Sequence, residues 1–444
     1  MNAKLKKLWS DAREAFWLLP ALVVAGGIVL AVVLVNVDRS ARIPAWLVEG
    51  GWLYNGGATG ARTLLGAVAS STIGVAGTVF SITIAALSLA AGQMGPRLLR
   101  NFVRDRGNQA TLGMLLGTFC YALVVLRSVR GQEEGLFIPH LALGGATLLA
   151  FGCVGMLVYF VGHVAGRINV DTVIDLVSED MRIAISRSTD GVDPLFPPPQ
   201  AFWRGATTIA DQRRGYLQHL DAGTLADRAA ANGVAIRLLV RPGSYVFPGA
   251  PIALVVGSAG NADDVRQAIR AATALGGQRT SEDDLEYAVR QLVEVGVRAL
   301  SPGINDPYTA VSVIDRLGSA LCDLVGVRLP SGVLARDGRP VLVVPPVDYD
   351  GLVDAMFHMI RQNADGSPAV LIRIVDVLTA VAACERLPQR QATLRRHAQL
   401  VLDAGRRTIG SRDDLQDLEL RIDEFERELA SVPAADAHGA AADA

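Results

Sequence analysis

The residues that could do chemistry in this chain fall in two places: a stripe of small residues in an apolar stretch, and a polar cluster further along. Between Leu64 and Gln93, small residues recur every three or four positions, at Gly66, Ser70, Gly74, Gly77, Ser81, Ala85, Ser88 and Gly92. This spacing places them on one face of an α-helix. Such a face either packs closely against another helix or uses its hydroxyl groups to line a narrow hydrated path. Both interpretations stay open.

The polar cluster lies around the segment SPGINDPYT, between two helical patterns. It comprises Arg279, Arg298, Ser301, Asn305, Asp306, Tyr308 and Thr309. Asp306 stands directly before Pro307, which predicts an N-cap followed by proline in the first helical position. The cluster could hold a small ligand or form a subunit contact. The alternative is a capped turn in which Arg279 or Arg298 pairs with Asp306.

No spacing typical of a catalytic centre occurs in the chain. There is no GxSxG or HExxH motif, and the six histidines are isolated from one another in sequence. His219, His358 and His397 are interpreted as surface or core residues rather than metal ligands, and Asp350 and Asp354 as an exposed helix start. The sequence therefore predicts no metal, no cofactor and no catalytic residues.

Composition indicates a membrane protein with an additional soluble part. Half of the 444 residues are hydrophobic, and the formal net charge is −2, which argues against a nucleic-acid partner. The four cysteines, Cys120, Cys153, Cys322 and Cys384, are scattered and are interpreted as core thiols. All three lysines lie within the first seven residues, which excludes Schiff-base and P-loop chemistry from the soluble part.

Four segments have the length and apolar character of membrane spans, since a span needs about 20 apolar residues. They are Phe16 to Val37, Leu64 to Gln93, Thr111 to Leu126 with an extension to Val129, and Leu141 to Gly166. Lysine and arginine near the span ends number eleven on one side and five on the other. By the positive-inside rule, both termini are expected in the cytoplasm. This predicts a multi-pass membrane protein whose region after the fourth span lies in the cytoplasm.

An arginine-rich segment follows the second span, with Arg97, Arg100 and Arg104 at helical spacing. We expect it to lie along the inner membrane surface, where it sets topology and contacts lipid headgroups. A specific anionic-lipid site, or a positive mouth that concentrates anions, is the alternative.

The expected fold is a four-helix membrane domain followed by a cytoplasmic α+β region. The membrane domain takes residues 1–187 with a helical extension, and a proline-rich linker takes 188–204. A small β-rich part, similar to a barrel or sandwich, takes 205–258, with strand-like runs ATTIA, GYLQHLD, VAIRLLV and APIALVV. A helical part takes 259–430, including a helix with Ser281 as its N-cap, and 431–444 forms a disordered tail.

Four strings of the sequence resemble the bacterial domain-of-unknown-function 2254 family. They are AGTVFSITIAALSLAAGQMGPRLLRNFVRDR, GYLQHLD, RLLVRPGSYVFPG and RALSPGINDPYTA. The resemblance extends over almost the whole chain and implies an integral inner-membrane protein with N-terminal helices and a cytoplasmic C-terminal domain. It implies no activity, substrate or catalytic residue.

Two functions remain in view. The first is an oligomeric channel or pore-like protein whose second span surrounds an axis and whose soluble part gates or assembles it. Its partners are the lipid bilayer, further copies of the same chain and anionic lipid. The second is a membrane-anchored sensor or scaffold that recognises a cytoplasmic ligand or protein at the polar cluster.

Overall fold

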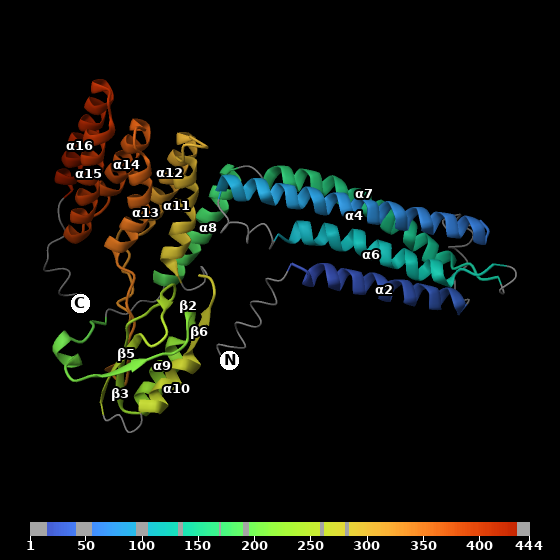
Figure 1. Ribbon diagram of the computed structural model, residues 1–444, viewed down its shortest axis with the longest axis horizontal. Helices are drawn as coiled ribbons and strands as arrows, with labels where there is room; N and C mark the ends of the chain where they lie inside the picture. Colours follow the sequence, from blue (N-terminus) through green and yellow to red (C-terminus); the bar gives the residue numbers. More distant parts are fainter. Residues whose placement is uncertain are drawn as a thin grey trace. The chain divides into compact units, whose positions relative to one another are not determined.

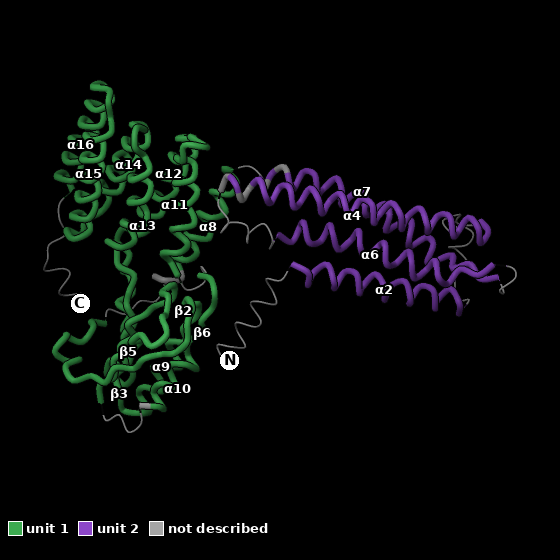
Figure 2. Tube along the Cα trace, viewed as in Figure 1, with its two compact units in different colours: residues 1–8, 170–444 green, residues 9–169 purple. Residues whose placement is uncertain are grey.

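The computed structural model describes residues 16–40, 56–94, 105–131, 136–167, 170–189, 195–257, 262–279 and 284–432. The chain divides into two compact units (Figure 2). The N-terminal unit spans residues 9–169, and the C-terminal unit spans residues 170–444 together with residues 1–8. Of the predicted tail, 431–444, residues 433–444 lie outside the described residues, and Ser431 is still part of the last helix.

Among its described residues, the N-terminal unit has four helices long and apolar enough to cross a membrane, as predicted (Figure 1). They are α2 (Leu18–Arg39), α4 (Ala58–Met94), α6 (Arg106–Ser128) and α7 (His140–Arg167). Helix α4 begins six residues before the predicted span, because the polar first turns continue the helix beyond its apolar part. It is 37 residues long, against 22 for α2 and 23 for α6.

Helix α6 is the centre of this unit, since α2, α4 and α7 each pack against it. Glycines let α2 and α6 approach closely. A Cβ atom added at Gly27 would stand 2.7 Å from the carbonyl oxygen of Gly117, and one added at Gly113 would stand 3.1 Å from Cα of Pro20. Close backbone approach at small residues is a common basis of helix association in membranes.

Aspartates close the N-terminal ends of two of these helices. The Asp38 carboxylate, at the end of α2, accepts hydrogen bonds from the backbone N–H groups of Leu141 and Ala142, both at 3.0 Å. Asp105 caps α6 by accepting from the N–H of Gly107 at 2.8 Å. The Tyr121 hydroxyl donates to the Ala142 carbonyl at 2.8 Å, so α6 is also tied to the first turn of α7.

The C-terminal unit contains two sheets. A five-stranded sheet has the order β1-β5-β3-β8-β7, and a three-stranded sheet has the order β4-β2-β6. The β3–β8 pair is parallel and all the others are antiparallel. The strands are β1 (Thr207–Ala210), β2 (Gly215–Leu220), β3 (Val234–Leu238), β4 (Tyr245–Val246), β5 (Pro251–Gly257), β6 (Thr273–Gly276), β7 (Val333–Arg336) and β8 (Arg339–Val343).

These sheets match the predicted strand segments, but the barrel or sandwich is not confirmed. The five-stranded sheet is open, with β1 and β7 at its edges. Strands β6, β7 and β8 come from the stretch assigned to the helical part. Strand β8, the parallel partner of β3, is supplied about 100 residues further along the chain. Short local patterns do not reveal such a long-range pairing.

The larger sheet is covered on both faces. Alternate residues of β3, such as Val234 and Ile236, pack with α9 (Ala222–Ala231) and α10 (Ala262–Ala272) in one core. Ala235 of the same strand packs with Trp203, from the short 3₁₀-helix η2 (Gln200–Trp203), in a second cluster. The alternation follows from the period of two along a strand. The described part of the predicted linker consists of residues 188–189, which end helix α8 (Val170–Thr189), and residues 195–204, which include η2.

The rest of the C-terminal unit is helical (Figure 1). Its helices are α8 (Val170–Thr189), α11 (Leu285–Ala299), α12 (Pro307–Asp323), α13 (Tyr349–Asn363), α14 (Pro368–Ala382), α15 (Pro388–Thr408) and α16 (Arg412–Ser431). Asp284, not Ser281, caps α11 by accepting from the N–H of Tyr287 at 3.0 Å; Ser281 itself lies outside the described residues. Helix α8 packs on α11 and α12, so it belongs to this unit rather than to the membrane-spanning helices.

Asp211 holds the turn after β1 by a buried ion pair. Its carboxylate accepts from the backbone N–H and the Nε of Arg213, at 3.0 and 2.8 Å, and from Arg270 at 3.3 Å. Arg213 in turn donates to the Thr273 hydroxyl at 2.7 Å. Burial alone raises the pKa of the Asp211 carboxyl, but the hydrogen bonds from Arg213 outweigh it and hold the pKa below its usual value.

The glycine contact between α2 and α6 predicts a difference between two adjacent glycines. Gly27→Ala should lower the free energy of unfolding by about 1–3 kcal/mol, because its Cβ collides with the backbone of α6. Gly26→Ala is the matched control, since a Cβ there has no neighbour within 4 Å. Thermal unfolding of both variants in detergent tests this, and equal midpoints would contradict the close contact.

The Asp211 ion pair predicts a pH-dependent loss of stability. Asp211→Asn should lower the free energy of unfolding by about 1–3 kcal/mol at pH 7, because two arginines lose their charged acceptor. The lowered folded pKa means that this stability is present above the unfolded pKa of about 3.9 and disappears as the pH falls through the folded value.

Melting curves at pH 7 and in steps below pH 4 check this prediction. The gap between the wild type and Asp211→Asn should narrow in acid. Asp227→Asn removes an exposed ion pair with Arg336 and should cost less than about 1 kcal/mol. A gap that stays constant down to the lowest pH would count against the ionised Asp211 pair.

Candidate functional site

Helix α4 has two faces of different character. One face packs within the unit. Its buried residues recur at steps of three and four positions and are Ala61, Leu65, Ala69, Thr72, Ala76 and Val79. Counted at about 100° per residue, the small residues lie on the nearly opposite face. Ser70, Gly74, Gly77, Ser81 and Ser88 are exposed, and Gly66 is half-buried. The stripe therefore points away from the neighbouring helices of its own chain.

The glycines of this stripe have open space beside them. A Cβ atom added at Gly66, Gly74 or Gly77 would meet no heavy atom of the structure within 4 Å. At Gly27, Gly113 and Gly117 of the α2–α6 contact, by contrast, an added Cβ would stand within 3.2 Å of the facing helix. Close packing inside one chain thus accounts for these three glycines, but it does not account for Gly66, Gly74 or Gly77.

The hydroxyl groups of the stripe donate to their own helix. The Ser81 hydroxyl donates to the Gly77 carbonyl at 2.9 Å, and the hydroxyls of Thr78 and Ser70 donate to Gly74 and Ala67, both at 3.2 Å. These three hydroxyl donors stay satisfied when this face meets an apolar environment. The hydroxyl oxygens keep lone pairs that can accept hydrogen bonds from water.

Arg97, Arg100 and Arg104, which were predicted to lie along the membrane surface, are outside the described residues. Near that part of the sequence, the structure describes a polar contact that the sequence did not suggest. His163 Nε2 lies 2.6 Å from the buried Asp105 carboxylate, and the Tyr159 hydroxyl lies 3.3 Å from His163 Nδ1. Asp105 thus ties the end of α7 to the start of α6 in addition to capping α6.

The predicted polar loop is a capped turn. Asp306 caps α12 by accepting from the backbone N–H of Thr309 at 3.2 Å and from its hydroxyl at 2.6 Å. Asn305 has φ of 50°, a left-handed conformation that asparagine tolerates better than most residues. The Ser301 hydroxyl donates to the Arg298 carbonyl at 2.7 Å. Asn305 and Asp306 therefore have local structural roles.

The two arginines of the predicted cluster lie at different ends of α11. Arg279 pairs with Asp284, the N-cap of α11, and its guanidinium lies 5.6 Å from the centre of the Tyr287 ring. It does not pair with Asp306. Arg298, in the last turn, lies 3.7 Å from Glu294. A helix of 15 residues separates the two ends by about 20 Å, so Arg279 is not part of the loop around Asn305.

One group with metal-ligand character was missed from the sequence. Asp354 and His358 of α13 lie beside His397 of α15, and one ligand atom from each lies within 4.8 Å of the others. The available signal was the spacing of Asp354 and His358, which is one helical turn. The third residue is 39 positions further on, and only the packing of α13 against α15 brings it near.

Four apolar helices followed by a mixed α/β unit define a multi-helix membrane protein. The model of a family described as "Predicted membrane protein (DUF2254)" matches residues 13–380, and the chain belongs to this family, as the resemblance implied.

Similar proteins occur in mycobacteria. The chain is 30% identical to "Uncharacterized protein Rv1290c" of Mycobacterium tuberculosis over 434 residues, which cover 93% of this chain and 80% of that protein. "Uncharacterized protein Mb1321c" of Mycobacterium bovis has the same identity and coverage. No solved structure shows significant similarity to the chain.

The capped turn predicts that Asp306 stabilises α12. Asp306→Ala should lower the free energy of unfolding by about 0.5–2 kcal/mol, because the cap to Thr309 is lost. Asp306→Asn is the control, since its amide oxygen can still accept the bond and the loss should be much smaller. Chemical denaturation of both variants distinguishes them. Identical stability of wild type and Asp306→Ala would remove the capping role.

Proposed function

We propose that the protein is a homo-oligomeric, channel-like protein of the bacterial inner membrane. In this proposal the small-residue stripe of α4 meets the same face of other copies around a central axis. The C-terminal unit and both termini lie in the cytoplasm, where that unit gates or assembles the oligomer. The observation that carries the proposal is the position of the stripe, which is exposed and faces away from α2, α6 and α7.

The outward face of α7 differs from the stripe of α4 in the size of its side chains. On α7, outward positions carry Leu148, Phe151, Val154 and Val158, each at least 60% exposed, as suits contact with lipid chains. The stripe of α4 instead offers glycine and serine. Bulky residues flank it, among them Phe80 and Leu89, each about half exposed. A shallow strip between larger side chains is typical of helix faces that approach another backbone or a narrow water path.

The distribution of positive charge supports the orientation. Lysine and arginine near the span ends favour one side by eleven to five, which is the bias expected of the cytoplasmic side. Arg97, Arg100 and Arg104 belong to this set. On the cytoplasmic side they would contact anionic lipid headgroups or concentrate anions near the end of α4.

The alternative role, a membrane-anchored sensor or scaffold that binds at the polar loop, has weaker support. Asn305 and Asp306 are both used by the turn itself, and Arg279 is paired about one helix length away. The exposed Tyr308 leaves a surface there, but it brings no set of polar groups to a common point.

Conductance of the purified full-length protein in planar bilayers tests the channel. We expect wild-type conductance, and a decrease of roughly two-fold or more in Gly77→Val and Ser81→Leu, because both add bulk to the stripe. Gly155→Val is the matched control, since Gly155 of α7 is also exposed with no neighbour within 4 Å of a Cβ.

Native mass spectrometry of the same preparations reports the oligomeric state. A wild-type monomer, no conductance in any oligomeric state, or equal conductance in Gly77→Val, Ser81→Leu and Gly155→Val would overturn the proposal.

A further inference from the structure

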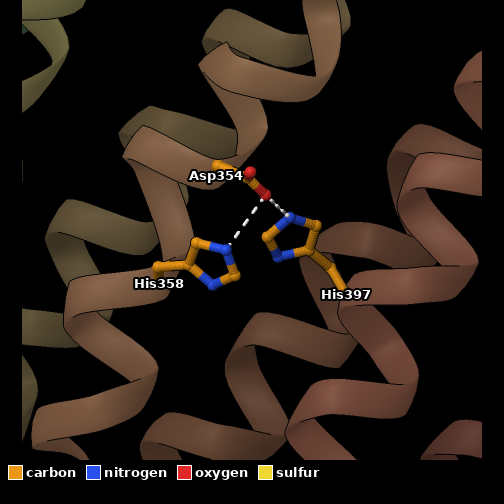
Figure 3. Close-up of side chains that lie close together, drawn as sticks. All are labelled: Asp354, His358 and His397. Atoms are coloured by element: carbon orange, nitrogen blue, oxygen red, sulfur yellow. Dashed lines mark hydrogen bonds and ion pairs between the residues drawn. The ribbon is translucent and has the colours of Figure 1, made fainter.

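The imidazoles of His358 and His397 converge on one carboxylate oxygen of Asp354 (Figure 3). His397 Nε2 lies 2.8 Å from Oδ1 of Asp354, and His358 Nε2 lies 3.1 Å from the same atom. The centres of the two imidazole rings are 5.0 Å apart. Asp354 and His358 are one turn apart on α13, and His397 comes from the facing side of α15, so two helices supply the group.

The group formed by Asp354, His358 and His397 is buried on one side and reaches solvent on the other. The His397 side chain has no exposed surface, whereas those of Asp354 and His358 are 37% and 33% exposed. Within the described residues, Nδ1 of His358 and Nδ1 of His397 are buried without a hydrogen-bond partner. Phe357 lies beside His397, with ring centres 6.1 Å apart, so the buried side of the group is apolar.

Burial lowers the pKa of His397 to about 4, and Arg396 and His358 act in the same direction, against the hydrogen bond to Asp354. Metal ions bind the neutral imidazole and the ionised carboxylate.

The spacing of these donors suits one small cation. Zinc binds imidazole nitrogen at about 2.0–2.1 Å and carboxylate oxygen at about 2.0–2.2 Å, and tetrahedral coordination separates neighbouring donors by somewhat more than 3 Å. The ligand atoms here lie within 4.8 Å of one another, so small rotations of exposed side chains are sufficient. Two imidazoles and one carboxylate are a donor set typical of divalent first-row transition metals.

We propose that Asp354, His358 and His397 bind a divalent transition-metal ion of the zinc class. Water occupies the position left open on the exposed side of Asp354 and His358. The ion clamps α13 to α15 within the C-terminal unit. This site is independent of the proposed channel function.

Arg396 provides a discriminating test, because it competes with the ion. Its Nη2 donates to the same Asp354 oxygen at 2.6 Å, and its side chain is 42% exposed. A bound cation must displace this guanidinium. If the three side chains bind metal, Arg396→Gln should increase the affinity for the ion. If they form only an ion-pair network, Arg396→Gln should not change the affinity.

The experiment uses the full-length, untagged protein in detergent, stripped of metal with a chelator and titrated with Zn²⁺ by calorimetry. We expect one ion per chain in the wild type, and affinity more than about 10-fold weaker in Asp354→Asn and in His358→Gln. Both positions are partly exposed, so both variants should fold. His219→Gln is the control, since His219 lies on β2, outside the α13–α15 pair, and should leave binding unchanged.

Co²⁺ titration of the wild type is the second measurement, and it does not depend on any variant folding. Visible absorption bands of low-symmetry Co²⁺, saturating at one equivalent and displaced by Zn²⁺, would support the site. Absence of these bands, absence of Zn²⁺ binding, or binding that persists unchanged in Asp354→Asn and His358→Gln would overturn it. So would equal affinity in Arg396→Gln and the wild type.

Discussion

The N-terminal unit depends on satisfying the backbone N–H groups at helix ends that have little access to water. An unpaired group in hydrocarbon costs several kcal/mol, so a membrane helix that begins without a cap is strongly disfavoured. Here Asp38 of α2 supplies both acceptors for the first turn of α7, across more than 100 residues of sequence. Tyr121 of α6 binds the same turn.

These bonds have a geometric consequence for α4. They connect α2, α6 and α7, and the glycines between α2 and α6 bring those two helices close. Helix α4 then packs against α6 and α7 with one face only. The sequence left two interpretations of the stripe open, close packing against another helix and lining of a hydrated path. The stripe does not pack against the described helices of its own chain, and its partner is lipid, another copy or water.

Much of this arrangement was predictable from local patterns. Apolar length predicted the four spans, and Asp306 followed by Pro307 predicted the start of α12. The apolar residues of α11, from Leu285 to Val295, recur at helical spacing and are buried. Such features depend on residues within one or two helical turns, where spacing alone decides which face a side chain occupies.

The features that the sequence did not reveal depend on contacts between distant segments. Strand β8 joins β3 from about 100 residues away, and His397 meets Asp354 only because α15 packs on α13. Asp38 gave no sign that it would cap a helix beginning at His140. The predicted polar cluster is brought together only in part: Asp306 caps its turn, as the capped-turn alternative expected, but α11 lies between Arg279 and Asn305.

The length of α4 sets it apart from its neighbours in relation to the bilayer. Its candidate membrane span, Ala58–Leu89, has 32 residues and is about 48 Å long, whereas a hydrocarbon core is about 30 Å thick. Helices α2 and α6 measure about 33 and 35 Å and match that core closely. The excess must be accommodated by tilt, local thickening of the lipid or extension into the headgroup region. A change in bilayer thickness therefore acts on α4 differently from α2 and α6, and it shifts which part of the small-residue stripe lies at the midplane.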